Sequence, residues 1–152
     1  MELKEFDRSF QKICEAMVQV AFGLVESIKK NVEGVYVYVS IEETLAYDVF
    51  YKINGKIAET NEVNDVSKKK VDLSDDTILS MLDEGMEYVI QVRNLFKSDK
   101  REIPTQLKLV YEPKSGKFDI GISYEIFYSN HKEWMSETIF DRWVEEVKKS
   151  IE

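Results

Sequence analysis

The chain has 152 residues, of which 43% are hydrophobic and 33% charged, so it should fold as a single domain around one core. Its formal net charge of −8, from 29 acidic and 21 basic residues, repels phosphate backbones and argues against direct binding of nucleic acid. No apolar stretch approaches the roughly 20 residues that a bilayer span needs, and the single cysteine excludes an internal disulfide.

The first 30 residues predict one long helix. From residue 2 to residue 30, apolar side chains recur at steps of three and four, as one face of a helix requires. The opening MELKEFDRSF lacks the basic and then apolar regions of a signal peptide. Together with the single cysteine, this start favours a cytoplasmic protein that does not bind membranes.

Two strands and a tight turn follow this helix. The stretch GVYVYVSI is rich in β-branched and aromatic residues, and TLAYDVFYKI alternates apolar with polar side chains. The linker between them is short, so they should form an antiparallel hairpin. Asn54-Gly55 is a strong signal for a type I′ turn, because both of its central positions need positive φ, and a short third strand over residues 56–60 should come next.

A polar connection over residues 61–72, expected to be mobile, leads to a second helix. Ser74 is a good N-cap, and the apolar spacing continues to about Lys97. Gly85 interrupts this helix, which predicts close packing or a bend at that point. Pro104 then stops helical structure and leads into the next strand.

A second hairpin and a last helix complete the chain. QLKLVYE is the first strand, Pro113-Lys114-Ser115-Gly116 is a four-residue loop, and FDIGISYEIF is the second strand. The last helix should run from residue 132 to residue 151. Four apolar side chains of the second strand should face the core in a firm register: Phe118, Ile120, Ile122 and Tyr124.

The predicted element order is α-β-β-(β)-α-β-β-α. This order indicates an α+β fold, with an antiparallel sheet of about four to five strands and the helices packed on one side of it. No repeat or composition shift divides the chain, so residues 1–152 should form one domain.

The residues offer no convincing catalytic, cofactor-binding or metal-binding constellation. His131 is the only histidine, and Cys14 lies beside an apolar helical stripe, where a cysteine usually acts as a small hydrophobe. Asp119 and Glu125 share a predicted strand face but are about 20 Å apart, too far for a glycosidase pair. The residues therefore give no positive support for a catalytic or cofactor-binding role.

Acidic residues do cluster along the chain. Asp83, Glu84 and Glu87 gather on the second helix, and Glu42 and Glu43 lie in the first hairpin. Such charges most often form a solvated surface. Together they would also present an acidic surface to a basic partner, and we name these five residues as candidate partner contacts.

Trp134 is the remaining candidate contact. It is nine residues from Trp143 on the predicted last helix, so the two side chains cannot both face the core. Trp143 fits the apolar stripe of that helix. Trp134 is either an exposed anchor for a partner or a ring packed on the sheet edge.

Three segments together resemble the YezG-like immunity or antitoxin family of bacteria. They are VEGVYVYVSIEETLAYDVFYKI, VRNLFKSDKREIPTQLKLVYEPKSGKFDIGISYE and the Trp-bearing FDRWVEEVKKS. The chain departs from the family pattern at Val32-Glu33-Gly34 and at Ile103-Pro104, near which members often carry a Trp. Three short motifs match the pattern: Asn94-Leu95-Phe96-Lys97, Gly116-Lys117-Phe118 and Ser123-Tyr124-Glu125.

This resemblance implies a non-enzymatic protein that binds and neutralises a cognate secreted toxin, often a nuclease domain, inside the producing cell or its siblings. The expected partner is a basic toxin domain, and the expected state is a monomer or weak homodimer. Two other interpretations stay open on the residues alone. One is a small enzyme with a dispersed carboxylate site, and the other is an adaptor or chaperone of a secretion system.

Overall fold

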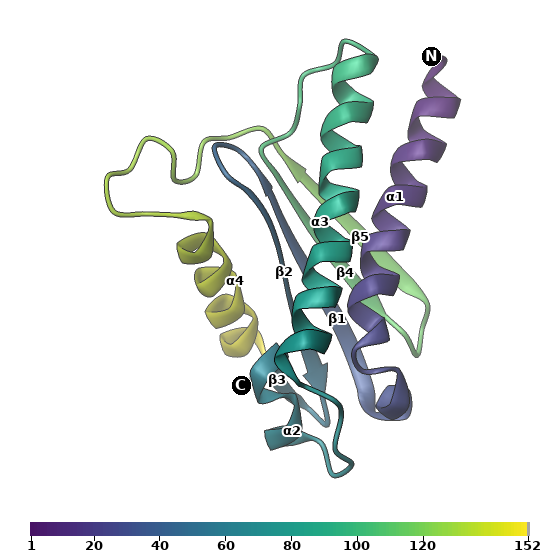
Figure 1. Ribbon diagram of the computed structural model, residues 1–152, viewed down its shortest axis with the longest axis vertical. Helices are drawn as coiled ribbons and strands as arrows, with labels where there is room; N and C mark the ends of the chain where they lie inside the picture. Colours follow the sequence, from purple (N-terminus) through teal and green to yellow (C-terminus); the bar gives the residue numbers. More distant parts are fainter. Residues whose placement is uncertain (152) are drawn as a thin grey trace.

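Five strands form one antiparallel sheet in the order β3-β2-β1-β4-β5, with β1 at its centre (Figure 1). The computed structural model describes residues 1–151. The helical elements are α1 (Leu3–Gly23), η1 (Glu26–Asn31), η2 (Thr60–Glu62), α2 (Val63–Val66), α3 (Asp75–Ser98) and α4 (Ser136–Ser150), and the strands are β1 (Val32–Ile41), β2 (Leu45–Ile53), β3 (Lys56–Glu59), β4 (Gln106–Glu112) and β5 (Lys117–Ser123). The predicted α+β class, element order and antiparallel sheet are confirmed.

The helices cover both faces of the sheet, and the prediction that they lie on one side is wrong. Helices α1 and α3 pack on one face, and α4 packs on the other (Figure 1). The reason lies in β1, where the buried Val35, Val37 and Val39 face α1 and α3. Tyr38, at an alternate position, joins a second core with α4. Because both faces of β1 are apolar, each must be covered.

Gly85 lets α3 lie directly on the aromatic ring of Tyr47. A Cβ atom built at residue 85 would lie 2.2 Å from that ring, so no other residue fits without displacement. Tyr47 in turn donates a hydrogen bond from its hydroxyl to the carbonyl oxygen of Met17 in α1, at 2.5 Å. Tyr51 bonds the carbonyl oxygen of Ala21 in the same way, at 2.6 Å. The close packing expected at Gly85 is therefore confirmed.

Several predicted boundaries are wrong. The first helix ends at Gly23, and a separate 3-10 turn covers Glu26–Asn31. The last helix begins at Ser136, which leaves Trp134 in the preceding loop. The connection over residues 61–72 is partly ordered, because it contains α2 and the Asn64 side chain bonds both the N–H and the carbonyl of Val71.

Strand β5 is shorter and less buried than its alternation predicted. It ends at Ser123, and Ile122 and Tyr124 remain 44% and 46% exposed. Phe118 and Ile120 are half-buried against the α1 side of the core. Because β5 is an edge strand, only part of its apolar face is covered. Within residues 1–151, no helix combines the length and hydropathy that a bilayer span requires.

Candidate functional site

Helix α3 presents an acidic surface to solvent. The predicted contacts Asp83, Glu84 and Glu87 are all exposed, and they line one open hollow of about 620 Å³. Asp76, Ser80 and a 57% exposed Leu79 complete this surface, which we call the α3 acidic face. In the part of the chain that the structure describes, none of its carboxylates forms an ion pair within 4.0 Å.

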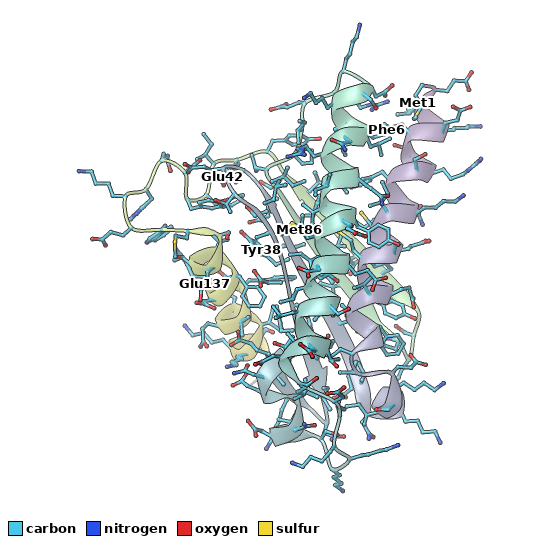
Figure 2. The ribbon with its side chains drawn as sticks, in the orientation of Figure 1. Met1, Phe6, Tyr38, Glu42, Met86 and Glu137 are labelled. Carbon is cyan, nitrogen blue, oxygen red and sulfur yellow. The ribbon has the colours of Figure 1, made fainter. Side chains whose placement is uncertain are left out.

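Glu42 holds the loop between β5 and α4 in place (Figure 2). Its carboxylate accepts hydrogen bonds from the backbone N–H groups of Phe127, Tyr128 and Ser129, at 2.9, 3.1 and 2.7 Å, and from the Ser129 hydroxyl. Partial burial raises the pKa of Glu42, but these hydrogen bonds favour the ionised form and together lower the pKa below its usual value. The side chain is therefore engaged within the protein.

Tyr128 provides the second anchor of this loop. Its buried hydroxyl lies 2.6 Å from the Ser40 hydroxyl, and it bonds both the N–H and the carbonyl of Thr44, at 3.1 and 3.0 Å. The end of the β1–β2 hairpin and the loop before α4 are thus tied together by side chains. No local pattern in the sequence indicates this pairing, because the partners are more than 80 residues apart.

Replacing Glu42 with alanine is expected to loosen this loop. Three backbone N–H groups would lose a charged acceptor, so we expect a loss of about 1–2 kcal/mol and faster hydrogen exchange at residues 127–129. Glu43 is exposed and makes none of these bonds, so Glu43→Ala is a matched control with little expected effect. Equal exchange protection in the two variants would contradict the anchoring role.

Trp134 is half-buried and lies in the anchored loop. Its indole stacks on the imidazole of His131, with ring centroids 4.3 Å apart and an interplanar angle of 14°. On α4, the guanidinium of Arg142 lies 4.7 Å from the centroid of the same indole. Trp134 therefore joins the loop to α4. Together with buried Trp143, it lines a cleft between α4 and β4.

Asp48 on β2 lies close to two acidic residues of α4, Glu137 and Asp141. Burial, with a smaller contribution from the negative charges of Glu137 and Asp141, raises the pKa of Asp48 from its usual 3.8 to about 6. Burial and Glu137 also raise the pKa of Asp141. No local pattern in the sequence indicates this proximity, because it depends on α4 packing on the sheet face opposite α1 and α3.

These acids do not form a metal centre within residues 1–151. In that range no group of three or more His, Cys, Asp or Glu side chains is arranged to hold a metal ion. Cys14 is fully buried, and burial raises the pKa of its thiol to about 12, which disfavours the nucleophilic thiolate. Asp119 lies in β5 and Glu125 beyond its end, both exposed.

The structure separates the six candidate contacts into groups. Asp83, Glu84 and Glu87 come together on α3, as predicted from their spacing. Glu42 bonds the backbone of the loop before α4, Trp134 packs within that loop, and Glu43 is exposed next to it. Helices α3 and α4 lie on opposite faces of the sheet, so the two groups belong to different surfaces (Figure 1).

The fold and these surfaces define a small α+β protein that exposes a charged helix face and an aromatic cleft. The family model described as "Immunity protein YezG-like" matches residues 9–145, nearly the whole chain. The chain therefore belongs to the YezG-like immunity protein family, and its general role is that of an immunity protein with a cognate toxin as partner. Among curated proteins, no sequence matches the chain.

Proposed function

We propose that this immunity protein binds a cognate secreted toxin in the cytoplasm of the producing cell and neutralises it by protein–protein interaction. The proposed target is a basic nuclease domain, and the proposed contact surface is the α3 acidic face. The protein acts without a cofactor and without catalysing a reaction. It works as a monomer or weak homodimer, and it contacts neither nucleic acid nor a membrane.

The single observation that supports this surface is the set of unpaired carboxylates around Leu79. Asp83, Glu84 and Glu87 lie on one exposed side of α3, and a large apolar side chain stands among them. A nuclease domain must hold a polyanion, so it tends to be basic near its site. An acidic surface steers such a domain into fast association, and an exposed apolar side chain beside the acids adds contact area that excludes water.

Co-expression with the toxin domain encoded by the neighbouring gene tests the function itself. The chain should restore growth of cells that produce this domain, and the two proteins should co-purify. Failure of both rescue and co-purification would overturn the proposed function. Nuclease assays on the purified domain, with and without the immunity protein, test the proposed target class separately.

Charge reversal on α3 tests the contact surface. The triple variant Asp83→Lys, Glu84→Lys, Glu87→Lys should slow association with the toxin domain by roughly tenfold or more at low salt, and should weaken the salt dependence of the rate. Stopped-flow association rates at several ionic strengths provide the measurement. As a control, an equal change in net charge on α1, using the exposed Glu5, Asp7 and Glu15, should slow association much less. Equal slowing by both variants would refute a specific α3 contact.

A further inference from the structure

A cleft of about 210 Å³ opens between β4, α4 and the anchored loop, on the sheet face opposite the α3 acidic face. Aromatic and apolar side chains form much of its wall. Buried Trp143 and Ile139 come from α4, and half-buried Trp134 and Phe127 come from the loop. The full lining, which we call the aromatic cleft, is Gln106, Lys108, Phe127, Trp134, Ile139, Arg142, Trp143 and Glu146.

Two cations line the aromatic cleft over its indole rings. The Lys108 ammonium lies 5.1 Å from the centroid of the Trp143 ring, and the Arg142 guanidinium lies 4.7 Å from that of Trp134. Among residues 1–151, neither cation has a carboxylate partner within 4.0 Å, and the nearby Glu146 is the only acid in the lining. In a chain of net charge −8, the cleft thus brings together two positive charges and one negative charge.

Gln106 adds an unused hydrogen-bond acceptor to the cleft. Its side chain is only 6% exposed, and its Oε1 atom is the one buried side-chain N or O atom without a hydrogen-bond partner in the described chain. Leaving such an atom unpaired costs free energy, and native proteins contain few of them. An N–H group from a bound molecule would satisfy it.

We propose that the aromatic cleft is a second binding site, which takes an acidic residue of an extended segment of a partner protein. The carboxylate of that residue pairs with Arg142 and Lys108. A backbone N–H of the same segment donates to Gln106 Oε1, and the aliphatic part of the side chain packs against the apolar wall of the cleft. One ligand residue thus matches the cations, the acceptor and the aromatic wall, which is the pattern of a pocket that holds one anchor residue.

The test uses the full chain and two capped peptides, acetyl-Gly-Glu-Gly-amide and acetyl-Gly-Gln-Gly-amide. Both tryptophans of the chain line the cleft, so intrinsic fluorescence reports directly on its occupancy. At low ionic strength, the Glu peptide should change the emission saturably, and the Gln peptide should bind at least about tenfold more weakly. No saturable change, or equal binding of the two peptides, would overturn the proposal.

Three variants locate the binding. Arg142→Gln should abolish the preference for the Glu peptide, whereas Lys149→Gln, on exposed α4 surface outside the cleft, should keep it. Gln106→Leu should weaken binding about fivefold while leaving the protein equally or more stable, because it removes an unpaired acceptor.

Unchanged binding by Arg142→Gln and Gln106→Leu would overturn the proposal. The proposal would also be overturned if the wild-type protein formed a dimer that Arg142→Gln dissociates, because a second copy of the chain would then occupy the cleft. Because no toxin is needed, failure here leaves the proposed function standing.

Discussion

Replacing Gly85 with alanine is expected to destabilise the protein by roughly 2–4 kcal/mol. The new Cβ atom would lie 2.2 Å from the Tyr47 ring, so either α3 or the ring must move. Displacing Tyr47 would also break its buried hydrogen bond to the Met17 carbonyl, which joins β2 to α1. Urea unfolding followed by circular dichroism measures the loss as a lower midpoint with an unchanged m-value.

Gly23 provides a matched control for this substitution. A Cβ atom at residue 23 has no neighbour within 4 Å, so Gly23→Ala should leave stability unchanged or raise it by up to about 1 kcal/mol. A double-mutant cycle isolates the steric cause, because Gly85→Ala should cost little once Tyr47 is alanine. If Gly85→Ala were as stable as the wild type, the close approach of α3 to Tyr47 would be disproved.

Asp48→Asn is expected to stabilise the protein at pH 7 by about 1–2 kcal/mol. This is less than the roughly 3 kcal/mol that a shift from 3.8 to about 6 corresponds to, because solvent still reaches the side chain. Burial is the main cause of the raised pKa, and Glu137 and Asp141 on α4 add repulsion. The amide keeps the shape of the side chain but removes the charge that is unfavourable in the folded state.

The raised pKa of Asp48 also determines how the contribution of this residue to stability changes with pH. Between about pH 3.8 and 6, the folded protein binds more protons at Asp48 than the unfolded chain does, so the contribution of Asp48 to stability falls as pH rises. The penalty is absent below this window and complete above it. The difference in unfolding free energy between Asp48→Asn and the wild type should therefore grow from near zero at pH 3.5 to its full value by pH 7.

Urea unfolding at several pH values measures this difference. Asp119→Asn is the control, because Asp119 is exposed on β5 and the same change there should shift stability by less than about 0.5 kcal/mol at every pH. A pH-independent difference for Asp48→Asn would show that neither burial nor the acids of α4 raise the pKa of Asp48.

Much of the fold follows from local patterns in the sequence. The Asn54-Gly55 turn has the positive φ angles of 52° and 78° that its residues predicted, and Ser74 caps α3 by accepting a hydrogen bond from the Thr77 N–H. Both features depend on a few adjacent residues. The short linker between β1 and β2 likewise predicted their antiparallel pairing.

The layer arrangement could not be predicted in the same way. Tyr38 and Phe50 are apolar side chains on the second face of β1 and β2, but nothing local in the sequence indicates that α4 covers them. The last helix was predicted from residue 132 but begins at Ser136, after a loop that Glu42 and Tyr128 anchor through contacts across the chain. The extent of β5 depended equally on the helices above it, which leave Ile122 and Tyr124 exposed.

The sequence by itself determined the α+β class, the order of elements, the clustering of acids on α3 and the resemblance to the family, because each depends on residue type and short-range spacing. Only the tertiary structure decided that α4 covers the opposite face of the sheet, that Glu42 is engaged by a loop, and that Gln106, Arg142 and the two tryptophans share a cleft. Those facts arise from packing between segments far apart in the chain, where both faces of β1 must be buried and each buried polar group needs a partner.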